Sequence, residues 1–186
     1  MELIIILGLI IGAVLFFIVI YNRLIALREK RKNAFSDIDV QLKQRHDLIP
    51  NLVNVVKGYA THEQTILENV TMARSNAMRQ STIDGKAAAE TGLGAAMMQL
   101  FAVAENYPDL KADQNFQRLQ SELSDIENKI AAARRFFNNA TNELNTAIQQ
   151  FPAVIVARMF NFTEENFFEM TPEEKALAEQ PPEVQF

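Results

Sequence analysis

Residues 113–152 read DQNFQRLQSELSDIENKIAAARRFFNNATNELNTAIQQFP, and this stretch decides the fold. Apolar side chains recur along it at alternating intervals of three and four residues. The eleven positions of this seam are Phe116, Leu119, Leu123, Ile126, Ile130, Ala133, Phe137, Ala140, Leu144, Ala147 and Phe151. A heptad spacing without glycine or proline places one apolar stripe along a helix. We therefore expect a long amphipathic helix, capped at its start by Asp113 and ended by Pro152.

A second heptad seam precedes this helix and runs from Phe35 to Ala77. Eleven of its thirteen positions are apolar, and the two polar ones are Arg45 and Glu63. Pro50 removes one backbone hydrogen bond, which predicts a kink and not a full stop. A shorter helix is expected from Gly85 to Asn106, with Asp84 as its cap. The fold class is therefore all-α, with an up-down-up antiparallel bundle of long helices.

The N-terminal segment Leu3–Ile20 reads LIIILGLIIGAVLFFIVI and carries no charge. As a helix its eighteen residues span about 27 Å, close to the hydrocarbon core of a bilayer. No positive segment precedes it and no small-residue cleavage site follows, so we expect an uncleaved transmembrane helix that continues into the bundle. The expected organisation is an anchor at 1–21, a basic juxtamembrane helix at 22–33, the bundle at 34–152, an aromatic-rich helical segment at 153–170 and an acidic tail at 171–186.

Basic residues follow the anchor and none precedes it. They are Arg23, Arg28, Lys30, Arg31 and Lys32. By the positive-inside rule they set the topology, with a short N-terminus outside and the bundle in the cytoplasm of a bacterium. Residues 22–163 balance 17 Lys and Arg against 15 Asp and Glu, so no basic field suggests nucleic acid as a partner.

Two further features suggest contacts between molecules. Gly8 and Gly12 form a G-x-x-x-G spacing, which lets two membrane helices approach closely. The aromatic side chains at 160–168 form either internal core or an exposed surface for self-association. They are Phe160, Phe162, Phe167 and Phe168.

The sequence offers little chemistry for catalysis or for binding a cofactor or metal. It has no cysteine, and its two histidines would lie about 24 Å apart along one helix. His62-Glu63 begins an H-E-x-x-H motif, but Ile66 occupies the second histidine position. Arg45 and Glu63 could form a proton or ligand site, or they could be buried register-setting charges, with an Asp or Glu of the long helix, such as Glu122 or Asp125, as partner. We expect no catalytic, cofactor or metal residues, and no enzyme activity.

Several stretches resemble one bacterial family. They are Tyr21-Asn22, AFSDIDVQLKQRHDLIPNLVNVVKGYATHE at 34–63, ARS at 73–75, the long run from ENYPDLKA at 105–112 to Pro152, and FFE at 167–169. On these residues the chain resembles the LemA family. The resemblance implies an N-terminal transmembrane helix and a helical bundle, often described as cytoplasmic, without an established activity, cofactor or substrate.

Together these features predict a non-enzymatic, membrane-anchored helical scaffold or adaptor. Its expected partners are the lipid bilayer of the bacterial cytoplasmic (inner) membrane and further copies of itself in a homo-oligomer. The alternative is an accessory regulator of a membrane protease or transporter, for which another membrane protein would be the partner.

Overall fold

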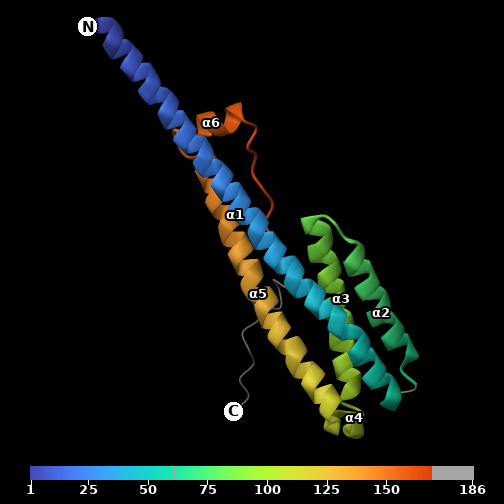
Figure 1. Cartoon of the computed structure of the whole chain (residues 1–186). Coiled ribbons are helices and arrows are strands. Elements are labelled where there is room, and N and C mark those ends of the chain that lie inside the picture. Colours follow the sequence, from blue (N-terminus) through green and yellow to red (C-terminus); the bar gives the residue numbers. More distant parts are fainter. Residues whose placement is uncertain (61, 169–186) are drawn as a thin grey trace, which may run out of the picture. The chain divides into compact units, whose positions relative to one another are not determined.

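The structure, a computed structural model, describes residues 1–60 and 62–168. The acidic tail expected at 171–186 and the last two residues of the aromatic-rich segment lie outside the described residues. Within the described residues six helices follow one another (Figure 1): α1 (Glu2–Tyr59), α2 (Gln64–Arg79), α3 (Ile83–Ala104), α4 (Pro108–Ala112), α5 (Gln114–Gln149) and α6 (Ala153–Met159). No strand occurs within the described ranges, and the all-α fold class is confirmed.

The chain divides into two compact units. Among the described residues, the anchor unit comprises Met1–Asp39 and Ala132–Phe167, and the bundle unit comprises residues of Val40–Ala131 with Phe168. Helices α1 and α5 supply residues to both units.

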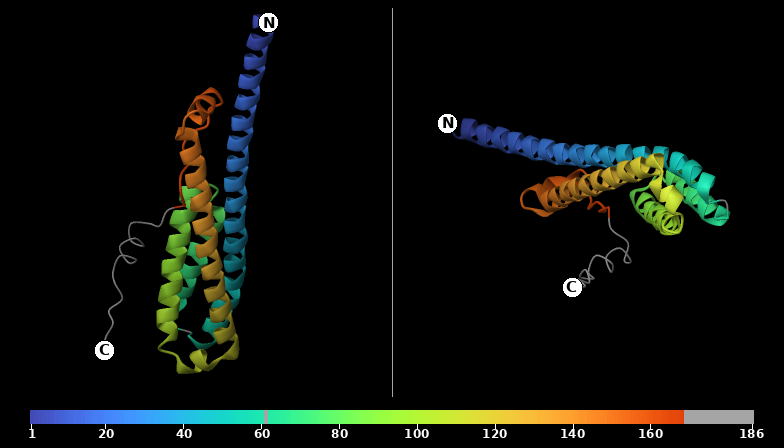
Figure 2. Two further views of the ribbon diagram at one scale, coloured as in Figure 1. Left: turned by 90° about the vertical axis from the view of Figure 1, so that its left-hand side faces the viewer. Right: turned by 90° about the horizontal axis from the view of Figure 1, so that it is seen from below.

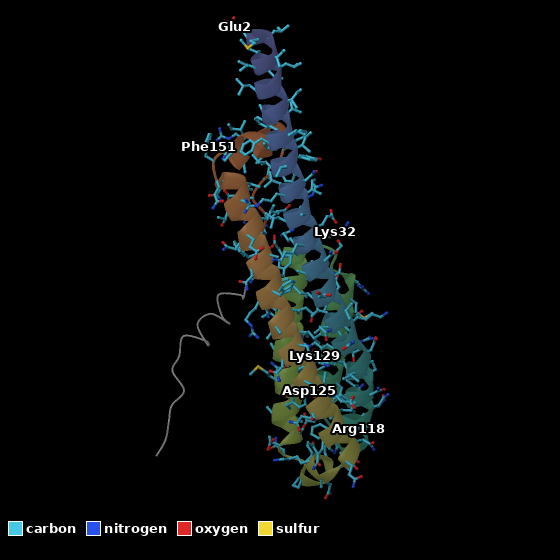
Figure 3. All side chains as sticks on the ribbon, turned by 60° about the vertical axis from the view of Figure 1, so that its left-hand side comes forward. Glu2, Lys32, Arg118, Asp125, Lys129 and Phe151 are labelled. Carbon is cyan, nitrogen blue, oxygen red and sulfur yellow. The ribbon has the colours of Figure 1, made fainter. Side chains whose placement is uncertain are left out.

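In the anchor unit, α1 from Ile20 onward runs beside the end of α5, and α6 folds back against α1 (Figures 1 and 2). Their shared core is small and aliphatic, and it contains Leu24, Leu144, Ala147, Ile148, Val156 and Ala157. Leu24 is fully buried, which contributes roughly 1.5–3 kcal/mol relative to an exposed leucine. The apolar residues before Ile20 have no such neighbours, and their side chains project freely between Glu2 and the level of Phe151 (Figure 3).

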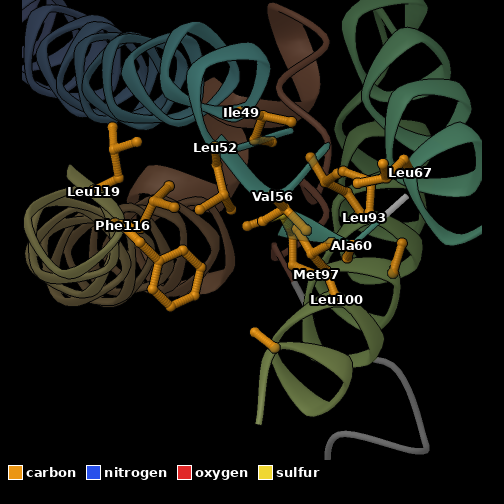
Figure 4. Packing of buried hydrophobic residues seen from close by; sticks show 14 of the residues in the cluster. Ile49, Leu52, Val56, Ala60, Leu67, Leu93, Met97, Leu100, Phe116 and Leu119 are labelled. Carbon is orange, nitrogen blue, oxygen red and sulfur yellow. The ribbon is translucent and has the colours of Figure 1, made fainter. Parts of the chain in front are cut away.

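In the bundle unit, the end of α1 packs with α2, α3, α4 and the start of α5. Ile49, Leu52 and Val56 of α1 are buried against Leu67 of α2 and a row of apolar side chains of α3 (Figure 4). That row includes Leu93, Met97 and Leu100. Phe116, Leu119 and Leu123 of α5 complete the same cluster.

One prediction about the helices is wrong. The seam from Phe35 to Ala77 is not one helix, because α1 ends at Tyr59 and α2 begins at Gln64. Helix α2 then packs against α3, so four helices cross the bundle unit where the spacing predicted three. Pro50 lies inside α1 without ending it, as expected.

The helix caps show which polar residues start each element. Asp113 accepts hydrogen bonds from the backbone N–H groups of Asn115 (2.8 Å) and Phe116 (3.0 Å), which confirms it as the cap of α5. Helix α3 is capped by Thr82, whose Oγ1 accepts from Gly85 N at 3.1 Å, and not by Asp84. Pro152 is the N-cap residue of α6.

The α5 seam is buried almost throughout. Nine of its eleven positions are buried and Ala133 is half-buried. Phe151 is the exception, with 81% of its surface exposed. The heptad pattern therefore predicts the core of α5 and fails only at its last position.

Candidate functional site

The first turns of α1 are the candidate membrane contact. Two helices of the described chain, α1 and α3, are long and apolar enough to cross a membrane. The apolar window of α1 is not buried at all, whereas α3 contributes Leu93, Met97 and Leu100 to the bundle core. Packing in the bundle core explains why α3 is apolar. Within the described residues, no such packing explains the apolar composition at the start of α1. Helix α1 is therefore the candidate span.

Gly8 and Gly12 lie on one face of this exposed helix. A Cβ atom added at either glycine would meet no atom within 4 Å. Neither glycine is thus needed for packing within one described chain. The open backbone at this spacing is available for another helix, and the contact itself stays a prediction.

The five basic residues after the anchor differ in their surroundings. Arg23 and Lys32 are exposed, and Arg28 lies 5.2 Å from the ring centre of Phe162. Lys30 forms an ion pair with Glu143 of α5 at 2.7 Å, with both side chains nearly half exposed. Such an exposed pair contributes at most about 1 kcal/mol, so Lys30 remains available as a topology signal.

Arg31 is mostly buried and holds the segment after α6 in place. Its guanidinium pairs with Glu165 at 3.1 Å and donates to Thr141 Oγ1 (3.0 Å) and to the carbonyl of Asn166 (2.9 Å). Burial lowers the pKa of Arg31 from its usual value, and the charge of Glu165 opposes that shift. Arg31 is therefore a structural residue as well as one of the predicted topology-setting charges.

The loop after α6 is fixed by two further devices. Asn161 has a positive φ of 55°, and the N–H of Phe162 donates to the carbonyl of Ala157 at 2.9 Å, which is a Schellman-type end of the helix. Beyond it, the side-chain amide of Asn145 exchanges two hydrogen bonds of 2.9 Å with the backbone of Glu165. The chain is thereby held against α5.

The four phenylalanines of the aromatic segment do not form one exposed surface. Phe168 is buried (3% exposed), and Phe167 and Phe162 are half-buried. Phe160 is 54% exposed and stacks on Tyr21 with ring centres 4.6 Å apart. The internal-core alternative therefore describes Phe168, and only Phe160 offers a largely open face.

A cluster of buried charges lies in the bundle unit. Arg45 of α1 pairs through one terminal nitrogen with Glu90 Oε2 of α3 at 3.1 Å, and His46 Nε2 lies 2.7 Å from Glu90 Oε1. Arg45 Nε lies 2.9 Å from Glu127 Oε1 of α5, an ion pair without the geometry of a hydrogen bond. The acidic partner on α5 is thus Glu127, and not the examples Glu122 or Asp125, and Glu90 of α3 is a second partner.

The cluster ties three helices together. Arg45, His46 and Glu90 are each less than 10% exposed, and both carboxylate oxygens of Glu90 are engaged. Removing a charge from water is costly unless a partner compensates for it, so these contacts favour one register of α1 against α3 and α5. The arrangement fits the register-setting alternative for Arg45.

Arg74 donates a hydrogen bond to the carbonyl of His46, which Pro50 leaves without its helical donor. In a regular helix the N–H of residue 50 would donate to the carbonyl of His46, and proline has no N–H. Arg74 of α2 donates to that carbonyl through Nε at 2.7 Å. The helix passes through Pro50 with this carbonyl hydrogen-bonded.

Two hydrogen bonds from tyrosine hydroxyls to carboxylates join the α1–α2 turn to the segments on either side of α4. Tyr107 donates to Glu63 at 3.2 Å, and Tyr59 donates to Asp113 at 2.9 Å. Burial and the Glu63 charge raise the pKa of Tyr107, while the hydrogen bond to Asp113 raises the pKa of Tyr59. Backbone and tyrosine hydrogen bonds lower the pKa of Asp113. Glu63 thus accepts a hydrogen bond from Tyr107.

No group of three or more His, Asp or Glu side chains suited to a metal ion occurs among the described residues. The bundle unit has a groove of about 630 Å³ between α1 and α2. Its lining mixes apolar and charged side chains and contains Val53, Lys57, Ala60, Gln64, Leu67, Glu68, Thr71 and Met72.

These features define a class of protein: an all-α chain with an exposed apolar N-terminal helix and a bundle cross-linked by buried charges. Residues 34–186 match the model of the LemA family. The chain belongs to the LemA family, as its sequence resemblance indicated.

Two kinds of curated relatives are similar to the chain. The magnetosome protein MamQ of Magnetospirillum gryphiswaldense is 25% identical over 178 residues, which cover 82% of this chain and 65% of the relative. Protein LemA of Metamycoplasma hominis is 28% identical over 142 residues, covering 74% of this chain and 63% of the relative. The chain thus spans slightly less than two thirds of the length of these relatives.

Proposed function

We propose that this LemA family member is a non-enzymatic helical scaffold anchored in the bacterial cytoplasmic membrane, where it self-associates. The observation that carries the proposal is the continuity of α1. Within the anchor unit this helix runs without a break from an unburied apolar segment to Leu24, which is fully buried against α5 and α6. A packed helical unit is thereby joined to a candidate span without an intervening loop.

Self-association is proposed through the face of Gly8 and Gly12. Their Cβ positions are open in the single chain, and close backbone approach drives helix pairing where lipid removes the hydrophobic effect between helices. The side-chain chemistry in the described interior supports a structural role, because Arg45, His46 and Glu90 are engaged with one another.

We propose the orientation given by the basic residues after the span, with the N-terminus outside. The chain has no cysteine, so Asn142→Cys, at an exposed position of α5, creates a single thiol. A membrane-impermeant thiol reagent should label it only after lysis. Labelling in intact cells would show that the orientation is the opposite one.

The scaffold is tested by measuring the mass of the full-length protein in mild detergent by light scattering. We expect an oligomer for the unmodified chain and a smaller species for Gly8→Ile with Gly12→Ile. Both substitutions fit the single chain, so a smaller mass reports on the contact between copies. Ile10→Leu with Val14→Leu, on the opposite face, is the matched control and should leave the mass unchanged.

A monomer for the unmodified chain would contradict self-association and favour the accessory regulator of another membrane protein. Purification from native membranes would then yield a different protein in stoichiometric amount.

A further inference from the structure

The anchor unit carries an exposed apolar patch at and beside α6. Its members are Phe151 (81% exposed), Met159 (65%), Phe160 (54%) and Ile155 (43%), here called the α6 patch. Ile155 and Met159 are spaced four residues apart on α6, a spacing that lies along one side of a helix, and Phe151 lies just before the helix. The opposite side of α6 is occupied, because Val156 and Ala157 are buried in the anchor-unit core.

The α6 patch lies beside the end of the candidate span. Helix α6 packs against Leu24, with Ile20, Tyr21 and Leu27 around the same cluster. A cleft of about 280 Å³ lies where the two meet. The cleft is lined by Phe16, Val19, Ile20, Arg23 and Leu24 of α1, by Ala147 of α5, and by Gln150, Phe151, Pro152 and Ala153. The exposed Phe151 is thus at the height of the last turn and a half of the apolar segment.

That height corresponds to a definite depth in a bilayer. The apolar run Leu3–Ile20 is about 27 Å long against a hydrocarbon core of about 30 Å. Residues from Phe16 to Ile20 then occupy roughly the last 6 Å of the hydrocarbon core, on the side where the span ends. A side chain next to Phe16 meets acyl chains, and one next to Arg23 meets lipid headgroups.

We propose that α6 is an interfacial helix whose patch enters the same leaflet in which the span ends. The inference rests on the proposed membrane insertion of α1 and assigns phospholipid as the partner of the patch. The apolar surface of the patch is continuous with that of the span across the cleft, which favours lipid over a separate protein partner. Exposed Arg158 of α6 and Arg23 of α1 flank the patch at the level of lipid phosphates.

The patch is formed before lipid arrives. Tyr21 stacks on Phe160, and the Schellman-type end at Asn161 directs the following chain back toward α5. The hydrogen bonds between Asn145 and Glu165 hold that return segment. Insertion therefore requires no folding step, and little of the binding free energy is lost to ordering of the chain.

The absence of tryptophan from the chain makes depth measurable. Full-length variants Phe151→Trp and Met159→Trp are placed in vesicles of phosphatidylethanolamine and phosphatidylglycerol whose acyl chains are brominated near the headgroup or near the chain end. Phe16→Trp reports on the span. Phe136→Trp is the matched control, because Phe136 is 48% exposed and lies beside Lys30, ten residues beyond Ile20 and so about 15 Å along α1.

We expect bromine near the headgroup to lower the emission of Phe151→Trp and Met159→Trp roughly twofold, with weaker quenching by bromine near the chain end. Phe136→Trp should keep its emission with both lipids. Circular dichroism of each variant checks that the helices are intact.

The outcomes separate this inference from the proposed function. An unquenched Phe16→Trp would mean that α1 is not in the bilayer, and the membrane anchor itself would fail. A quenched Phe16→Trp with Phe151→Trp behaving like Phe136→Trp would overturn the interfacial helix and leave the anchor. A blue-shifted Phe151→Trp that no bromolipid quenches, and whose shift disappears at high lipid-to-protein ratio, would assign the patch to a second copy and also overturn the inference.

Discussion

At the scale of single residues, the buried charge cluster shows what a heptad pattern can and cannot reveal. Arg45 was visible as a polar residue in an apolar seam, so its burial and pairing could be predicted. Glu90 was missed, although it is the only charged residue between Lys86 and Glu105. The partner on α5 was placed at Glu122 or Asp125, and the structure selects Glu127, because spacing alone does not fix the height of one helix against another.

The cluster makes a testable contribution to stability. Glu90→Ala removes one of the two carboxylates that pair with buried Arg45 and the carboxylate next to His46, while Glu127 remains, and should destabilise the protein by about 3 kcal/mol. For a chain of this size about 3 kcal/mol lowers the thermal midpoint by roughly 6–12 °C, measured by circular dichroism in detergent. Glu122→Ala, in an exposed pair with Arg118 at 3.8 Å, is the control and should change it by under about 2 °C. Equal midpoints for the two variants would contradict a stabilising role of the cluster.

Asp113 predicts a dependence on pH. Its pKa is lowered in the folded state, so its charge stabilises the fold above the unfolded value of about 3.9, and this contribution is lost as pH falls through the folded value. Asp113→Asn keeps a cap without the charge. It should melt roughly 2 °C below the unmodified chain at pH 7, and the difference should shrink as the pH falls below about 3.9.

The hydrogen bond from Tyr59 is one cause of the lowered pKa of Asp113. In a Tyr59→Phe background, the effect of Asp113→Asn at pH 7 should therefore be smaller. The account would be contradicted if the difference in thermal midpoint between the unmodified chain and the Asp113→Asn variant grew toward pH 3, because the pKa of Asp113 would then not be lowered by folding.

At the scale of elements, the sequence predicts helices better than it predicts their ends. The α5 pattern is strong enough to place nine of its eleven seam positions in the interior. The break between α1 and α2 could not be seen, because Glu63 and Ile66 continue the heptad in phase and neither glycine nor proline lies between Tyr59 and Gln64. The turn between α1 and α2 does not interrupt the heptad spacing, so the spacing cannot reveal the turn.

Pro50 of α1 and Arg74 of α2 act on the same backbone carbonyl, that of His46. Arg74→Met should destabilise the protein by about 1–3 kcal/mol, because the carbonyl of His46 loses its donor. In a Pro50→Ala background the new N–H of residue 50 can donate to that carbonyl, so Arg74→Met should cost clearly less. Thermal midpoints of the four chains give this double-mutant cycle. Additive effects of the two substitutions would show that Arg74 does not act through the carbonyl that Pro50 frees.

At the scale of the whole molecule, fold and function were accessible to different degrees. The all-α class, the apolar first helix and the LemA family follow from local patterns and motifs, and they are confirmed. The exposure of Phe151 depends on how the chain turns from α5 into α6, which no short-range pattern encodes. Self-association depends on a second molecule and must be measured.

The most direct measurement is cysteine cross-linking in native membranes, which the cysteine-free chain permits without background. Single variants Gly8→Cys, Ile10→Cys, Gly12→Cys and Val14→Cys are oxidised and examined for covalent dimers. Positions 10 and 14 lie about 200° around the helix from positions 8 and 12. The scaffold predicts dimers at positions 8 and 12 and few or none at positions 10 and 14. Equal cross-linking at all four positions, or none at any while the protein remains in the membrane, would contradict self-association through this face.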